Sequence, residues 1–321
     1  MSLPFYTADD VRAAVSMQEA ISAMELAFSS ISNGNAVVPQ RINLPIDGFN
    51  AHHLSMPSYL KEGKYITIKL INVNHDNPSN GLDLINGVID VISAHNGESL
   101  ALIDGQYVTA LRTGAASGLA TKLLSNANAS RAVIFGNGVQ AQTQIEAIRC
   151  VRDIQSIKII GRNPSNVDSF CAELDDVVSP GDVNDLDNAD IICTATSSPD
   201  PLFDYNQIPK GLHINAVGAH GPTKRELPTK LIQYSKVYVD SLSASHQEAG
   251  NLLIPINNND YNWEKIEGEI GNLILSNISG RLNDNDITIF NSIGSAIQDL
   301  SLIHISEPTR LLSIAYAVLW L

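Results

Sequence analysis

The chain has 321 residues, and its 34 acidic against 20 basic side chains give a formal net charge of −14. Hydrophobic residues make up 44% of the chain, which is typical of globular proteins and excludes a disordered one. The acidity disfavours nucleic acids and anionic membranes as partners, because both bind clustered positive charge. The length exceeds what one hydrophobic core usually serves, so we expect two domains.

The cysteines and the N-terminal residues indicate the cellular compartment of the protein. Cys150, Cys171 and Cys193 are too few for a disulfide framework, and their spacing matches no metal site. Asp9 and Asp10 stand where a signal peptide would be apolar, and no run approaches the ~18 apolar residues of a membrane span. We therefore expect a cytoplasmic protein with no bound metal and no membrane partner.

In chain order, the first predicted element is a helix over residues 7–33, where apolar side chains recur at helical spacing up to Gly34. Glycine-punctuated runs of apolar and β-branched residues then predict a mostly antiparallel meander. Its strands are expected at residues 41–45, 51–60, 64–73, 86–94 and 98–105. A second helix, rich in alanine and other small residues, is expected at residues 107–125.

From residue 131 onward, short apolar runs alternate with helical patterns. Strands are expected at residues 131–136, 154–161, 189–196, 213–218 and 236–240, and helices at residues 139–151 and 166–174. This alternation predicts parallel βαβ units, and hence an α/β fold with a doubly wound sheet.

The motif Gly136-x-Gly138-x-x-Ala141 lies directly between a predicted strand and a predicted helix. In a dinucleotide-binding turn the first glycine permits the tight bend and the second lets a pyrophosphate approach the backbone. The pyrophosphate then lies at a helix N-terminus, where free N–H groups and the helix dipole favour an anion. Since a second βα unit follows, the motif predicts a dinucleotide site rather than a purely structural turn.

The end of the second strand of this unit bears on which dinucleotide is bound. An acidic residue there would favour NAD, because it binds the ribose hydroxyl. The chain instead reads Gly161-Arg162-Asn163, and the Arg162 guanidinium suits a 2′-phosphate. We therefore expect NADP(H), with NAD(H) possible through backbone contacts and Arg162 then a solvated surface side chain.

Two later strands end in polar residues. Thr194 and Thr196 close one of them, and the next runs into a loop that carries His220. In such sheets ligands bind at the carboxyl ends of the strands. We therefore interpret His220 as a functional residue on a loop at that edge, rather than a structural histidine.

Five segments together resemble the ornithine cyclodeaminase/mu-crystallin family. They read KYITIKLINVN, ALRTGAASGLATKLL, VIFGNGVQAQTQ, HINAVGAHGPTKREL and FNSIGSAIQDL, in the order typical of the family. The resemblance implies an α+β substrate-binding and dimerisation domain at residues 1–115, completed by residues 295–321. It also implies a Rossmann domain at residues 116–294, a homodimer, and a helix over residues 287–305 that returns to the first domain.

The resemblance assigns roles residue by residue. Arg41, Lys69 and Arg112 match substrate-binding positions, and Ile293 matches a position that touches substrate. Cationic donors suit a small imino-acid carboxylate, which an arginine can bind in a bidentate way. The alternative for Lys69 is that it reaches solvent from an edge strand.

The cofactor-contacting positions come from the glycine motif and from the family. They are Gly136, Gly138, Val139, Gln140, Arg162, Thr196, Val217, Gly218, Lys224 and Ser292.

One departure from the family pattern separates the possible reactions. Ornithine cyclodeaminases have Gly-Gly-Asp in the loop where this chain has Gly218-Ala219-His220, and that aspartate is their proposed base. We therefore expect NAD(P)H-dependent reduction of a cyclic ketimine such as Δ1-pyrroline-2-carboxylate to proline, with Lys69 and His220 as catalytic residues. The alternatives are ornithine cyclodeamination to proline and ammonia with recycled NAD, and a non-catalytic protein that holds NADPH and a small ligand. Alanine dehydrogenase-like or opine-type imine chemistry is a further alternative.

The end of the chain also departs from the family. Glu307-Pro308 is expected to break a helix. Residues 301–321 are therefore not expected to form the family's docking helix.

Overall fold

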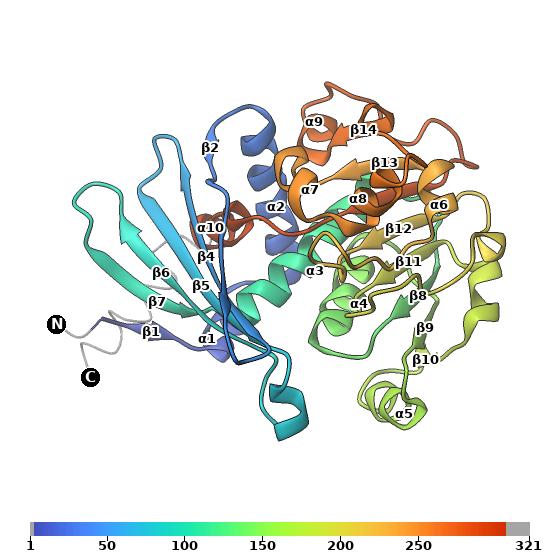
Figure 1. Ribbon diagram of the computed structural model, residues 1–321, viewed down its shortest axis with the longest axis horizontal. Coiled ribbons are helices and arrows are strands. Elements are labelled where there is room, and N and C mark those ends of the chain that lie inside the picture. Colours follow the sequence, from blue (N-terminus) through green and yellow to red (C-terminus); the bar gives the residue numbers. More distant parts are fainter. Residues whose placement is uncertain (1–2, 306–321) are drawn as a thin grey trace. The chain divides into compact units, whose positions relative to one another are not determined.

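The computed structural model describes residues 3–305, which divide into two compact units (Figure 1). The first unit holds the described residues up to Arg112 together with those from Ser295 onward. The second unit is Thr113–Gly294. The expectation about Glu307-Pro308 lies outside the described residues. The expectation that residues 301–321 form no docking helix is wrong for residues 301–305, which are the end of a helix that packs in the first unit.

The first unit is built on one seven-stranded sheet, antiparallel except for the pairing of its first strand. Its order is β1 (Phe5–Tyr6), β7 (Ser99–Asp104), β6 (Ile85–Ser93), β5 (Tyr65–Asn74), β4 (Ala51–Leu60) and β2 (Ala36–Val37), with β3 (Ile42–Ile46) also paired to β4. A single 3₁₀ turn, Asn77–Asn80, joins β5 to β6. The expected antiparallel meander is therefore confirmed.

The helix expected over residues 7–33 is two helices, so that prediction is wrong. They are α1 (Ala8–Ala14) and α2 (Met17–Ser32), separated by Val15 in an extended conformation. Ser16 and Glu19 form a capping box, in which Ser16 N donates to Glu19 Oε2 over 2.9 Å. The box starts a new helix because it satisfies N–H groups that a helix start leaves free.

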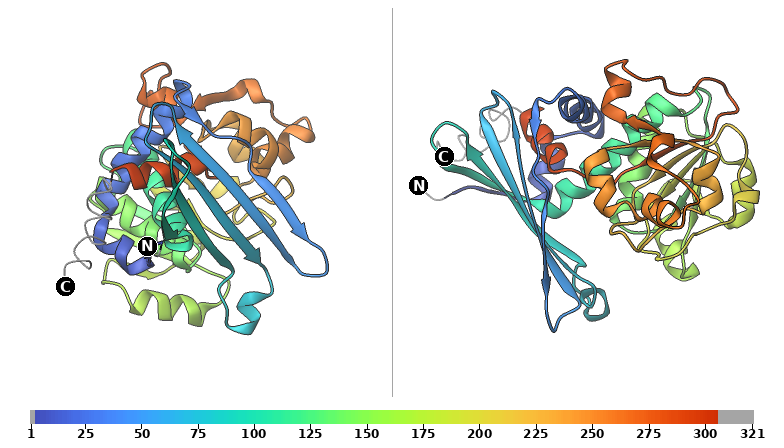
Figure 2. Two further views of the ribbon diagram at one scale, coloured as in Figure 1. Left: turned by 90° about the vertical axis from the view of Figure 1, so that its left-hand side faces the viewer. Right: turned by 45° about the horizontal axis from the view of Figure 1, so that its top comes forward.

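A helix from the end of the chain completes the first unit. It is α10 (Ala296–Ile305), which packs against α2, β4 and β5 (Figure 2). The helix expected over residues 287–305 is therefore wrong in its first part, where Thr288–Asn291 forms a strand. Every residue of that strand is buried, so it shows no alternation that would separate it from a buried helix.

The second unit contains an eight-stranded, fully parallel sheet, which confirms the predicted doubly wound α/β fold. Its order is β10 (Val178–Pro180), β9 (Ser156–Ile160), β8 (Arg131–Phe135), β11 (Ile191–Thr194), β12 (His213–Ala216), β15 (Thr288–Asn291), β13 (Lys236–Val239) and β14 (Ile266–Glu269). The sequence did not predict β10, β14 and β15. The late strand β15 enters the sheet between β12 and β13.

Helices connect the strands of the second unit. They are α4 (Val139–Val151), α5 (Pro164–Ala172), α6 (Thr229–Gln233), α7 (Leu242–Glu248), α8 (Gly250–Asn257) and α9 (Ile270–Ile274), with 3₁₀ turns at Val183–Asn188, Tyr205–Gln207 and Trp263–Lys265. The small-residue helix α3 (Gly105–Leu124) begins in the first unit and ends in the second.

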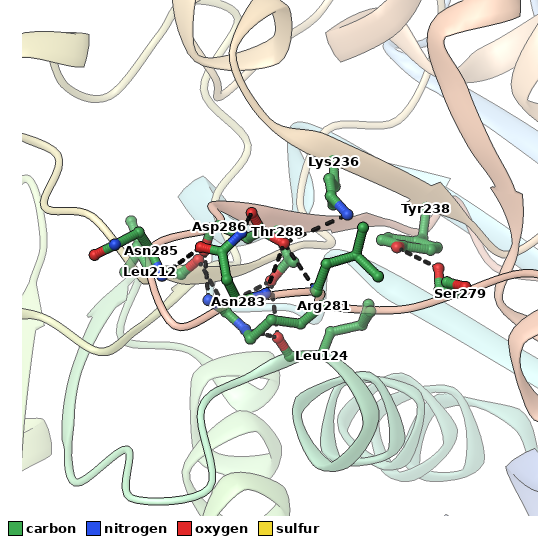
Figure 3. A network of polar contacts seen from close by, with 11 residues as sticks. Leu124, Leu212, Lys236, Tyr238, Ser279, Arg281, Asn283, Asn285, Asp286 and Thr288 are labelled. Atoms are coloured by element: carbon green, nitrogen blue, oxygen red, sulfur yellow. Dashed lines mark hydrogen bonds and ion pairs between the residues drawn. The ribbon is translucent and has the colours of Figure 1, made fainter.

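A polar network holds the C-terminal end of α3 in the second unit (Figure 3). Arg281 donates from Nε to the Leu124 carbonyl oxygen over 2.8 Å, and from Nη2 to the Leu212 carbonyl oxygen over 3.2 Å. It also donates to Thr288 Oγ1 and to the carbonyl of Asp286. A guanidinium at this position satisfies free helix carbonyls and complements the helix dipole. The network thereby joins α3 to the starts of β12 and β15.

His213 is buried next to this network at the start of β12. Its Nδ1 lies 3.0 Å from Thr288 Oγ1, and its Nε2 lies 3.1 Å from Asn215 Oδ1. Burial lowers the pKa of His213 to about 3. The imidazole is therefore neutral at ordinary pH and acts as part of the core.

Within residues 3–305, no helix has both the length and the apolarity needed to cross a membrane. The same residues contain no cluster of three or more side chains that could hold a metal ion.

Candidate functional site

The glycine turn of the second unit leads from β8 into α4. Gly136 has a φ of +113°, which disfavours residues with a side chain. A Cβ at Gly136 would also lie 2.6 Å from the Ala195 carbonyl oxygen, whereas one at Gly138 would meet nothing within 4 Å. The turn is therefore tight at Gly136 and open at Gly138, where a pyrophosphate would approach.

The N-terminus of α4 suits an anion. Gly138 is its N-cap and provides no side-chain cap, so the first N–H groups of the helix have no such partner. Val139 is exposed, while Ala141 is fully buried and permits close packing below the turn. Gln140 Oε1 is buried and has no hydrogen-bond partner among the described residues. These features fit the pyrophosphate of a dinucleotide.

Arg162 follows β9 and is exposed. No hydrogen bond or ion pair of its side chain is seen in the described part of the chain. The next residue, Asn163, caps α5 by accepting from Ser165 N over 3.0 Å. No acidic residue stands between residues 161 and 167. The end of β9 therefore presents a positive charge where NAD-binding folds commonly carry a carboxylate.

A buried carboxylate that sequence reasoning missed organises the carboxyl ends of β11 and β12. Glu226 accepts five hydrogen bonds, from Thr194 Oγ1 (2.8 Å), Thr196 N (2.8 Å), Thr196 Oγ1 (2.7 Å), Gly218 N (3.0 Å) and Ala219 N (3.1 Å). Burial raises the pKa of Glu226, while these hydrogen bonds oppose that shift. Glu226 thus ties together the loops that carry Thr196 and Gly218.

The remaining residues expected on this loop lie close to Glu226 in sequence. Val217 is buried, and its N–H donates to the Thr194 carbonyl oxygen over 3.0 Å. His220 is exposed, two residues beyond Gly218, and Lys224 is half-buried. A Cβ at Gly218 would lie 2.3 Å from the Thr196 carbonyl oxygen, which explains the glycine.

A second buried carboxylate, Asp240, plays the same part at the ends of β13 and β15. Its Oδ2 accepts from Ser292 Oγ (2.8 Å), Ile293 N (3.0 Å) and Gly294 N (2.7 Å). Burial raises the pKa of Asp240 against these hydrogen bonds. Ser292 is therefore held at the carboxyl edge of the sheet, while the Ile293 side chain packs in the apolar core of the second unit.

In the first unit, Lys69 is buried in the centre of the sheet. Its neighbours across β4 and β6 are Met56 and Ile89. The Lys69 side chain is 1% exposed, and its Nζ lies 2.6 Å from Asp299 Oδ2 on α10. The alternative in which Lys69 reaches solvent from an edge strand is wrong, because β5 has a partner on both sides and α10 covers the side chain.

The structure brings Lys69, Arg112 and Arg41 together, and we call them the cation cluster. Arg112 is buried, with Nε 3.9 Å from Asp299 Oδ1, and Nη1 donates to Gln298 Oε1 over 3.1 Å. Burial, and then the positive charges of Arg112 and Arg41, lower the pKa of Lys69 to about 8, while Asp299 opposes them. Lys69 and Arg112 are buried and Arg41 is half-buried, and such a concentration of positive charge suits a small carboxylate.

Sequence reasoning missed Glu226, Asp240, Gln298 and Asp299. Glu226 and Asp299 stand inside segments that resemble the family, but a single acidic residue in a short segment has no periodic pattern. Several of their partners are distant in the chain: Asp299 meets Lys69, and Glu226 accepts from Thr194 and Thr196 on another loop. Only the fold reveals such a pairing.

The family model named ornithine cyclodeaminase/mu-crystallin family matches residues 3–307. A similar relative is Δ1-pyrroline-2-carboxylate reductase of Bacillus cereus, which is 34% identical over 301 residues, covering 92% of each chain.

Two solved structures share the fold and more than 30% identity. The structure of Thermococcus litoralis Δ1-pyrroline-2-carboxylate reductase in complex with NADH and L-proline has a TM-score of 0.93 and 32% identity, over 98% of both chains. An archaeal alanine dehydrogenase dimer with bound NAD has a TM-score of 0.91 and 31% identity, again over 98% of both chains. The expected resemblance is thus confirmed, and the chain belongs to the ornithine cyclodeaminase/mu-crystallin family.

Proposed function

We propose that this chain is an NAD(P)H-dependent reductase that converts a cyclic imino acid of the Δ1-pyrroline-2-carboxylate type to a cyclic amino acid such as proline. The observation that carries the proposal is the cation cluster around buried Lys69, because it provides a site for the substrate carboxylate. The relatives named Δ1-pyrroline-2-carboxylate reductase, at 34% identity over 92% of the chain, support this choice of substrate.

Each part of the site has a separate task. A nicotinamide coenzyme supplies the hydride, and the Gly136–Gly138 turn with the α4 N-terminus would hold its pyrophosphate. Arg41, Arg112 and Lys69 bind and orient the imino-acid carboxylate. When the C=N bond is reduced to a secondary amine, His220 or water would provide the proton on the ring nitrogen.

An assay with two substrates tests this function. NADPH absorbance is followed with Δ1-pyrroline-2-carboxylate, and in parallel ammonia is measured after incubation with L-ornithine and NAD. Loss of NADPH with the imine and no ammonia from ornithine is the expected result. Ammonia and proline from ornithine, without net consumption of coenzyme, would instead mean that His220 can replace the aspartate of the cyclodeaminases.

A third outcome separates catalysis from binding. A protein that binds NADPH tightly but turns over neither substrate would be the non-catalytic ligand-holding protein. The cation cluster suits a bound carboxylate in either case, so only turnover of the imine separates the reductase from a ligand-holding protein.

We further propose that NADPH is preferred to NADH. The support is exposed Arg162 at the end of β9 together with the absence of an acid at residues 161–167. The structures named with NADH and NAD belong to relatives at 32% and 31% identity, so acceptance of both coenzymes is expected. The ratio of kcat/KM for NADPH to that for NADH measures the preference.

We also propose a homodimer formed through the first unit. Strand β3 is exposed along its whole length, and Ile42, Leu44 and the nearby Phe49 are 63%, 57% and 70% exposed. Exposed apolar edge strands usually meet a partner. The relative solved as a dimer supports a second copy as that partner. Sedimentation should give twice the mass of the 34.6 kDa chain, and Leu44→Asp should lower it.

A further inference from the structure

We propose that Asp299 is a positioning residue of the cation cluster: its carboxylate holds the Lys69 ammonium in place and keeps it charged for the substrate carboxylate. The inference rests on the proposed function, because it assigns a new role at that same site. The role already exists in the free protein, so it can be tested without turnover.

The geometry of the pair is the first support. Asp299 Oδ2 lies 2.6 Å from Lys69 Nζ, and the two side chains are 0% and 1% exposed. The hydroxyl of Thr109, on α3, also accepts from Nζ, over 3.4 Å. An ammonium buried in this way depends on protein partners, because water does not reach it.

The charges around Lys69 are the second support. They are Arg112 on α3, Arg41 before β3 and Asp299 on α10, while Met56 and Ile89 on the flanking strands are apolar. Burial and the two guanidiniums favour the neutral amine, and they lower the pKa of Lys69 to about 8. Asp299 is the negative charge that opposes them, so its loss should neutralise Lys69 at lower pH.

The setting of Asp299 is the third support. It lies in the first turn of α10, where the helix dipole stabilises a negative charge. The preceding residue, Gln298, accepts from Ser295 N over 2.8 Å and from Arg112 Nη1 over 3.1 Å. The start of α10 is therefore anchored to Arg112 while it presents Asp299 to Lys69, which fixes both cations relative to each other.

The direct test is the titration of Lys69 in the folded, ligand-free protein. The chain is labelled with ¹³C at lysine Cε, and the Lys69 resonance is assigned from its absence in Lys69→Arg. Wild type should titrate near pH 8, and Asp299→Asn should titrate at least about one pH unit lower, with less than about a tenth of the amine left charged at pH 8. An unchanged midpoint in folded Asp299→Asn would overturn the proposal.

The second readout is the pH profile of imine reduction. Since the charged amine binds the carboxylate, kcat/KM falls as the pH rises through the Lys69 pKa, and Asp299→Asn moves this fall to lower pH. NADPH affinity should stay unchanged. Asp175→Asn is the matched control, because Asp175 forms a 2.7 Å ion pair with Arg149 on the surface, and its profile should equal that of wild type. If no imine is reduced, the proposed function fails while the titration still decides the role of Asp299.

A second variant keeps the test decisive if Asp299→Asn, with its uncompensated buried charge, does not fold. Gln298→Glu is then used, because it adds a carboxylate beside Arg112 in the same helical turn. The Lys69 midpoint should then rise. An unchanged midpoint would show that carboxylates at the start of α10 do not control Lys69, and the proposal would be rejected.

Discussion

The two units solve the problem of a buried carboxylate in opposite ways. In the first unit, Asp299 faces the full charges of Lys69 and Arg112. In the second unit, Glu226 and Asp240 accept hydrogen bonds from neutral N–H and O–H groups. Around Asp299, positive charge remains in excess. Glu226 and Asp240 instead accept hydrogen bonds from groups of the protein.

The difference teaches what each unit is built to do. A surplus of buried positive charge is costly unless a ligand neutralises it, which agrees with the proposal that the first unit binds the substrate carboxylate. A carboxylate that gathers backbone N–H groups holds loops in one conformation at the end of a sheet. Glu226 and Asp240 therefore connect the loops at the edge where the coenzyme is expected to lie.

The largest expected effect comes from Lys69. Lys69→Met should lower kcat/KM for the imine by about 10³-fold, since a buried charge at the carboxylate site is lost. NADPH affinity, measured by fluorescence titration, should change less than about twofold. Lys64→Met, an exposed lysine just before the same strand, is the matched control and should behave as wild type. A fully active Lys69→Met variant would show that the charge of Lys69 does not bind the substrate, and the contrast between the two units would then have no functional meaning.

A change at Glu226 tests the second unit. In Glu226→Gln the amide NH₂ would face donors such as Gly218 N and Ala219 N, so hydrogen bonds are replaced by repulsion. We expect the free energy of unfolding to fall by about 2–3 kcal/mol and NADPH to bind more weakly. Urea unfolding and a binding titration measure the two effects. Unchanged NADPH affinity in the folded variant would mean that the Glu226 loops do not hold the coenzyme.

Buried His213, in the second unit, predicts how the free energy of unfolding depends on pH. The pKa of folded His213 is lowered to about 3, so between that pH and about 6.5 the unfolded chain binds more protons than the folded one. Stability is therefore fully present above about pH 6.5 and is lost as the pH falls, by about 2 kcal/mol at pH 5. Urea unfolding at several pH values should show this slope, and it should be smaller in His213→Gln. Exposed His95→Gln should keep the slope of wild type.

The smallest effect is expected at Arg162. Arg162→Ser should reduce the ratio of kcat/KM for NADPH to that for NADH by about tenfold, because one charge-assisted contact with the 2′-phosphate is lost. Activity with NADH should stay close to that of wild type. Half-buried Lys158 lies on the same strand, but its Nζ donates to Ser179 Oγ, so Lys158→Ser is a useful comparison. An unchanged ratio in Arg162→Ser would remove the argument for NADPH.

Local pattern predicted much of the fold. The alternation of strands and helices after residue 131 was sufficient for the parallel sheet, because the first two strands of the unit are short apolar runs that are each followed by a helix. The break between α1 and α2 was missed although Ser16 and Glu19 form a capping box, since the apolar spacing continues across it. Strand β15 was missed because the family resemblance assigned residues 287–305 to one helix, and a short buried run such as Thr288–Asn291 has no alternation that contradicts a helix.

The candidate site was predictable only in part. The glycine turn, Lys69, Arg112 and Arg162 are visible because each stands in a motif or contrasts with its surroundings. Glu226, Asp240 and Asp299 are three of the 34 acidic residues of the chain, and no local sequence pattern indicates which residues they contact.

The sequence by itself determined the parallel α/β architecture, the dinucleotide turn and the family, because these depend on residues close together in the chain. The tertiary structure decided that Lys69 is buried, which cations surround it, and which carboxylates hold the loops. The physical reason is distance along the chain: a charge acquires its environment from residues that only folding brings within a few ångströms, and burial then decides the strength of each interaction.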